Sequence, residues 1–168
     1  MPHRYTNTMS SPPVTMQPIQ PLLLVDDSPE ELMLLQIGLK RAGIGLPQVA
    51  VNSGNEALDF LLGRGLYSAR DTSLLPRLTL MDLNMPGKSG LDVLREIRDH
   101  PRLSSMKVVI FSSSDEPDEI VRAHDLGANS FICKPLTAIG MRDVIRQISE
   151  RWLDIDLAAA PQAGKEAE

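Results

Sequence analysis

The chain has one cysteine, few aromatic residues and no long apolar run, and each shortage excludes a class of protein. Cys133 alone cannot form an internal disulfide, so a small disulfide-stapled secreted fold is excluded, and we expect this thiol to be buried in a strand. No run approaches the roughly 20 apolar residues that span a bilayer, and residues 1–16 lack the apolar centre of a signal peptide. We therefore expect a cytoplasmic protein with no membrane partner.

Positive charge is scarce as well. Lys and Arg number 17 against 22 Asp and Glu, which gives a formal net charge of −5, and the basic residues are scattered. Because binding a phosphate backbone needs clustered basic residues, we expect no nucleic-acid partner. Hydrophobic residues make up 42% of the 168 residues and aromatic residues only 4%, which predicts one globular domain with an aliphatic interior.

The composition changes towards both ends of the chain. Residues 1–20 combine prolines with polar residues and show no apolar period, which predicts a disordered N-terminal arm. Residues 154–168 are mainly alanines and charged residues with Pro161 and Gly164 and show no apolar period, which predicts a flexible C-terminal tail. Residues 21–153 remain as the folded domain.

Within this domain, short apolar runs alternate with stretches of helical period. The expected strands are 22–25, 48–51, 77–81, 107–112 and 130–133. The first helix illustrates the start signals: Ser28 can cap it, Pro29 suits its first turn, and Glu31 lies three residues after the cap. Parallel strands need right-handed helical crossovers, so five such units predict a doubly wound α/β sheet.

Four of these strands end in residues suited to phosphoryl chemistry. In chain order these are Asp26 and Asp27, then Asp82, Ser112 and Lys134. Ligands of open α/β sheets bind at the carboxyl ends of the strands, so we expect these side chains to converge on one edge. Crowded carboxylates raise one another's pKa unless a cation lies among them, and Mg²⁺ suits such oxygen ligands. The simpler alternative is that each residue merely ends a strand.

Asp82 follows the strand expected to be central, which makes it the candidate nucleophile. A carboxylate there can attack phosphorus and form an aspartyl phosphate. Because the transition state of phosphoryl transfer is loose, the protein mainly positions groups and neutralises charge. A metal ion, the Lys134 amine and the Ser112 hydroxyl are groups of the required types.

Taken together, these residues resemble the receiver domains of two-component response regulators, over about residues 22–152. The separations, 30 residues from Asp82 to Ser112 and 22 from Ser112 to Lys134, are also similar to those of the family. The resemblance implies a flavodoxin-like (βα)5 fold with strand order 2-1-3-4-5. It also implies a Mg²⁺-dependent transfer of a phosphoryl group from a histidine kinase to Asp82, which then switches protein–protein contacts.

The resemblance assigns a role to each site residue. Asp82 is the phosphoacceptor, Asp27 the direct metal ligand, Asp26 its supporting acid, and Asn84 a metal ligand through its backbone carbonyl. Ser112 and Lys134 contact the phosphoryl group. These roles imply a protein that promotes its own phosphorylation and dephosphorylation without a separate catalytic domain.

Two further expectations come from the same family. The Lys134–Pro135 bond is expected to be cis, which an X-Pro bond adopts at small cost. On phosphorylation, Ser112 is expected to move towards the phosphate while Phe131 turns into the vacated space. The alternative for Phe131 is that it is permanently buried core.

A finer resemblance is to the single-domain regulators that partner phytochrome-type histidine kinases. It depends on residues 23–30, the long connection 63–76, residues 82–87 and the closing Arg151-Trp152-Leu153. Apolar residues near the last helix, among them Leu136, Met141 and Trp152, exceed what one helix face buries. This surplus suggests a homodimer through the fourth helix, fifth strand and fifth helix.

Other functions of the same fold remain as alternatives. A phosphatase of the haloacid dehalogenase type needs an acid two residues after the nucleophile, and Asn84 cannot serve as one. A nucleotide or flavin binder needs a glycine-rich phosphate cradle after the first strand, where this chain has Asp27-Ser28-Pro29. A phosphate sink and a scaffold that is not phosphorylated also fit the fold.

Overall fold

The computed structural model describes residues 16–155. Residues 1–15 and 156–168, which hold most of the predicted arm and tail, lie outside the described residues. Helices and strands alternate along the described part. In chain order they are β1 (Leu22–Val25), α1 (Pro29–Arg41), β2 (Gln48–Val51), α2 (Gly54–Leu62), the 3₁₀ turn η1 (Gly65–Tyr67), β3 (Leu78–Met81), α3 (Gly90–Asp99), β4 (Val108–Ser112), α4 (Pro117–Asp125), β5 (Ser130–Cys133) and α5 (Ala138–Trp152).

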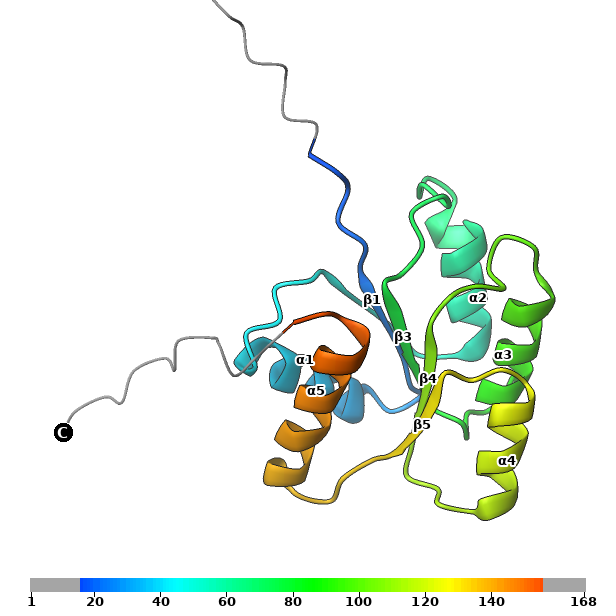
Figure 1. Cartoon of the computed structure of the whole chain (residues 1–168). Coiled ribbons are helices and arrows are strands. Elements are labelled where there is room, and N and C mark those ends of the chain that lie inside the picture. The colour runs from blue at the N-terminus through cyan, green and yellow to red at the C-terminus, as the bar shows by residue number, and fades with distance from the viewer. Residues whose placement is uncertain (1–15, 156–168) are drawn as a thin grey trace, which may run out of the picture.

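The five strands form one parallel sheet in the order β2-β1-β3-β4-β5, which confirms the predicted α/β topology. Helices α1 and α5 cover one face of the sheet, and α2, α3 and α4 cover the other (Figure 1). Because side chains alternate along a strand, Leu22 and Leu24 pack into the core beside α1 and α5, while Leu23 and Val25 pack into the opposite core. No helix within residues 16–155 has the length and apolar character to cross a membrane.

Helix α1 begins immediately after β1, as its capping residues predict. The Ser28 hydroxyl accepts a hydrogen bond from the backbone N–H of Glu31 at 3.3 Å, and Pro29 occupies the first turn. Such a cap stabilises a helix by about 1 kcal/mol. The cap therefore fixes the first turn of α1 at the edge of the sheet where β1 ends.

Strand β5 lies at the edge of the sheet and is less covered than the others. Phe131 is half-buried and packs against the core beside α3 and α4, whereas Cys133 is exposed. The prediction that Cys133 is buried is wrong, because an apolar strand is covered on both faces only inside the sheet, and β5 has one neighbouring strand.

Candidate functional site

Three carboxylates meet at the carboxyl ends of the central strands. Asp26 and Asp27 follow β1, Asp82 follows β3, and one ligand oxygen from each lies within 4.8 Å of the others. The side chains of Asp26 and Asp82 are buried, while Asp27 is exposed. Oxygen donors of this kind and spacing fit a hard divalent cation. The predicted clustering of the three carboxylates is present, and their roles as metal ligands stay predictions.

The two neighbouring aspartates have different surroundings. One oxygen of Asp26, Oδ1, accepts the backbone N–H of Ser28 at 2.9 Å, and Oδ2 accepts Lys134 Nζ at 2.5 Å. Both oxygens of Asp26 are therefore engaged by the protein. The carboxylate of Asp27 faces solvent at the same edge and has no hydrogen-bond donor among the described residues.

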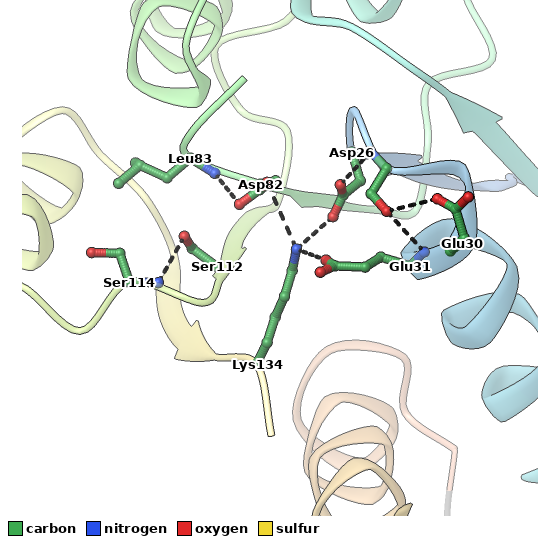
Figure 2. A network of polar contacts seen from close by, with 9 residues as sticks. Asp26, Glu30, Glu31, Asp82, Leu83, Ser112, Ser114 and Lys134 are labelled. Carbon is green, nitrogen blue, oxygen red and sulfur yellow. Dashed lines mark hydrogen bonds and ion pairs between the residues drawn. The ribbon is translucent and has the colours of Figure 1, made fainter. Parts of the chain in front are cut away.

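Lys134 crosses the site from the end of β5 and joins elements that are far apart in the sequence (Figure 2). Its ammonium pairs with Asp26 and with Glu31, and lies 3.7 Å from Asp82 Oδ2. Burial lowers the pKa of Lys134, but the hydrogen bonds with Asp26 and Glu31 outweigh burial and hold the pKa above its ordinary value. The lysine therefore carries its full charge at neutral pH.

Asp82 occupies the position expected of a phosphoacceptor. Its Oδ1 accepts the backbone N–H of Leu83 at 2.8 Å, which leaves Oδ2 as the oxygen that faces Lys134. Burial raises the pKa of Asp82, and the negative charge of Asp26 raises it further. The charge of Lys134 lowers this pKa, but the pKa stays above its ordinary value. A metal ion bound here would favour the charged form of Asp82, because its positive charge offsets both burial and the neighbouring carboxylate.

The hydroxyl predicted at the end of β4 is present. Ser112 is completely buried, and its Oγ accepts the backbone N–H of Ser114 at 3.3 Å (Figure 2). Burial is the largest influence on the pKa of Asp82 and raises it, whereas Ser112 contributes in the lowering direction. The structure thus brings together Asp26, Asp27, Asp82, Ser112 and Lys134, as the sequence predicted.

The Lys134–Pro135 bond was expected to be cis, but the residues described contain no cis peptide bond, so this prediction is wrong for the structure. Trans is the intrinsically preferred form of an X-Pro bond by roughly 0.5–1 kcal/mol. Asn84 is exposed in the loop after Asp82, and the role of its carbonyl as a metal ligand stays a prediction.

Glu31 is a site residue that the sequence reasoning missed. Its position three residues after Ser28 predicted a role in capping α1, but its side chain pairs with Lys134 instead. The sequence signal that could have identified Glu31 is the start of α1 directly after β1. This start places the side chains of the first turn at the edge of the sheet where the carboxylates cluster.

Mg²⁺ is expected to raise the midpoint of thermal unfolding of the wild type, because an ion that binds only the folded state stabilises that state. At a concentration a hundredfold above the dissociation constant, the stabilisation is about 2.7 kcal/mol. Asp27→Asn removes the exposed carboxylate and leaves the buried pair intact, so we expect less than half of this rise. Calorimetry with and without Mg²⁺ measures both values, with Asp99→Asn as a control at an exposed helix end. If Mg²⁺ raises the thermal midpoint of Asp27→Asn as much as that of the wild type, Asp27 is not a metal ligand.

Comparison with known proteins agrees with this geometry. The family model described as "Response regulator receiver domain" matches residues 22–146. The response regulator Rcp1 of Synechocystis is 32% identical over 144 residues, covering 85% of this chain and 96% of Rcp1. The chain thus matches nearly the whole length of that relative.

Two solved structures extend the comparison. Rcp1 with bound Mn²⁺ superposes with a TM-score of 0.72 at 30% identity, over 80% of this chain and 95% of Rcp1. The phosphorylated cyanobacterial phytochrome response regulator RcpA superposes with a TM-score of 0.74 at 31% identity, over 87% of this chain and 100% of RcpA. The predicted likeness to phytochrome-associated regulators is confirmed. The chain belongs to the response regulator receiver family.

Proposed function

We propose that this receiver accepts a phosphoryl group on Asp82 from the phosphohistidine of a histidine kinase, with Mg²⁺ held by Asp27, Asp82 and the Asn84 carbonyl, and with Asp26 as the supporting acid. The observation that carries the proposal is the clustering of these three carboxylates within 4.8 Å, with the Lys134 ammonium 3.7 Å from Asp82. No single strand end would suggest this chemistry, but the set supports a phosphoryl-transfer site.

The chemistry follows from the positions of the side chains. Asp82 Oδ2 attacks phosphorus, the new O–P bond forms as the P–N bond of the phosphohistidine breaks, and the imidazole keeps the electron pair. Lys134 and Ser112 bind oxygens of the transferred group as its charge redistributes. Mg²⁺ held by Asp27 and Asp82 would supply further neutralisation of this charge. Asp82 is regenerated by hydrolysis of the acyl phosphate, so the receiver acts as a signalling switch.

The partners follow from the family and from the exposed surface. The similarity to the phytochrome response regulator RcpA supports a histidine kinase of the phytochrome type as the phosphodonor. We propose that this transfer takes place in the cytoplasm. The face formed by α4, β5 and α5 is proposed to mediate homodimerisation. Val121, Leu136 and Ile139 support this assignment, because they are exposed apolar residues on or beside these elements.

The proposal is tested with a small phosphodonor such as acetyl phosphate. We expect the intact mass of the wild type to increase by one phosphoryl group when Mg²⁺ is present and to stay unchanged when Mg²⁺ is chelated. The added group is expected to be lost at alkaline pH, as an acyl phosphate is. Absence of any Mg²⁺-dependent increase in mass would overturn the proposal.

A further inference from the structure

The ammonium of Lys134 is shared unequally among three carboxylates. Asp26 Oδ2 lies 2.5 Å from Nζ and the Glu31 carboxylate is also in direct contact, whereas Asp82 Oδ2 is 3.7 Å away. Figure 2 shows Glu31 reaching the lysine from α1, on the side away from Asp82. Lys134 therefore lies closer to Asp26 and Glu31 than to Asp82, whose phosphoryl group it is expected to bind.

The two near partners differ in how firmly they hold the lysine. The side chain of Asp26 is 9% exposed and its other oxygen is fixed by the backbone of Ser28, whereas the side chain of Glu31 is 46% exposed. A cavity of about 190 Å³, lined partly by Glu31 and Lys134, lies beside the pair. The Glu31 side chain thus has room to move, and its ion pair is the more easily broken of the two.

A phosphoryl group on Asp82 brings new negative charge close to Lys134, and its oxygens compete with the Glu31 carboxylate for the ammonium. We infer that Glu31 is a positioning residue that holds Lys134 away from Asp82 in the unphosphorylated protein and releases it when the phosphoryl group forms. This inference rests on the phosphoryl acceptance proposed above. Glu31 therefore opposes the phosphorylated state, because its ion pair is lost when that state forms.

Helix α1 offers a matched control for this role. Glu30 carries the same charge in the same turn, but its carboxylate accepts the Ser28 hydroxyl at 3.2 Å and makes no ion pair with Lys134. Glu30→Gln and Glu31→Gln each remove one negative charge near the start of α1. Only Glu31→Gln removes the competing partner of the lysine.

The experiment measures binding of beryllofluoride, an unreactive analogue of the phosphoryl group, to the full-length protein by ¹⁹F NMR in Mg²⁺. An exposed ion pair contributes up to about 1 kcal/mol, so we expect Glu31→Gln to lower the dissociation constant by roughly two- to fivefold. Glu30→Gln is expected to match the wild type. The thermal midpoints of both variants report whether the fold is intact.

A spectroscopic measurement separates positioning from a structural role. The ¹⁵Nζ resonance of Lys134, assigned by its loss in Lys134→Arg, is expected to shift in Glu31→Gln and not in Glu30→Gln before any beryllofluoride is added. An unchanged dissociation constant in Glu31→Gln, or an equal change in Glu30→Gln, would overturn the inference while wild-type binding still supports the proposed function. Failure of the wild type to bind beryllofluoride would overturn both.

Discussion

Asp82→Asn is expected to abolish Mg²⁺-dependent phosphorylation, with no phosphoryl mass detected under conditions that phosphorylate the wild type completely. Asparagine keeps the size of the side chain and an oxygen that can accept the Leu83 N–H, which Asp82 Oδ1 accepts at 2.8 Å. It lacks the anionic oxygen that attacks phosphorus. Intact-mass measurements after acetyl phosphate treatment check this result, and Asp99→Asn is the control for loss of a carboxylate elsewhere.

The same variant is expected to have an equal or higher thermal midpoint than the wild type at pH 7 without divalent ions. Burial raises the pKa of Asp82 in the folded state, so the carboxyl contributes stability below its unfolded pKa of about 3.9 and loses that contribution as the pH rises through the folded pKa. At pH 7 the wild type therefore carries a destabilising buried charge that asparagine lacks. We expect the difference in midpoint to narrow as the pH falls towards 4.

A combined loss of phosphorylation and stability in Asp82→Asn would contradict this account. It would indicate that the variant is misfolded, and loss of the phosphoryl group could then be a consequence of unfolding. The site as described requires that function be lost while the fold is retained, because Lys134 keeps Asp26 and Glu31 as partners.

Gly90→Ala is expected to destabilise the protein by about 3 kcal/mol, near the upper end of overpacking costs. A Cβ at Gly90 would lie 2.2 Å from the carbonyl oxygen of Asp82 and 3.0 Å from Leu83 Cα. Both contacts are with backbone, so no side-chain rotation relieves them. Either α3 moves away from the loop after β3, or the backbone of Asp82 shifts. A shift of about 1 Å at a reacting group can slow a reaction about a hundredfold, so we also expect slower phosphorylation.

Gly45→Ala is the matched control, because a Cβ there meets no atom within 4 Å. Reduced freedom of the unfolded chain predicts a neutral effect or a gain of about 0.4–1 kcal/mol. Urea unfolding and the rate of phosphorylation by acetyl phosphate report both consequences. If Gly90→Ala has the stability and the phosphorylation rate of the wild type, the close approach of α3 to Asp82 contributes to neither.

Much of the fold could be predicted because its local signals agree with one another. The apolar runs place the strands, and Ser28 and Pro29 mark the start of a helix that the structure confirms. Five parallel strands joined by helices permit few topologies, and the strand order came from the family resemblance. Convergence of the strand ends then follows from the sheet itself, which is why five site residues could be named in advance.

The remaining features depend on tertiary contacts that local patterns do not encode. Glu31 fits a capping pattern, but the end of β5, 103 residues further along the chain, provides a cation that takes its carboxylate. Cys133 lies in an apolar run, yet its exposure depends on the place of β5 at the sheet edge. The same run of residues would be buried in a central strand.

The most direct test of the account is to locate the phosphoryl group. Borohydride reduction of the phosphorylated protein converts an aspartyl phosphate to homoserine, and peptide mass spectrometry identifies the position that is changed. We predict homoserine at position 82 and unmodified Asp26 and Asp27. Homoserine at either of those positions, or phosphoryl mass without any homoserine, would contradict the assignment of Asp82 as the phosphoacceptor.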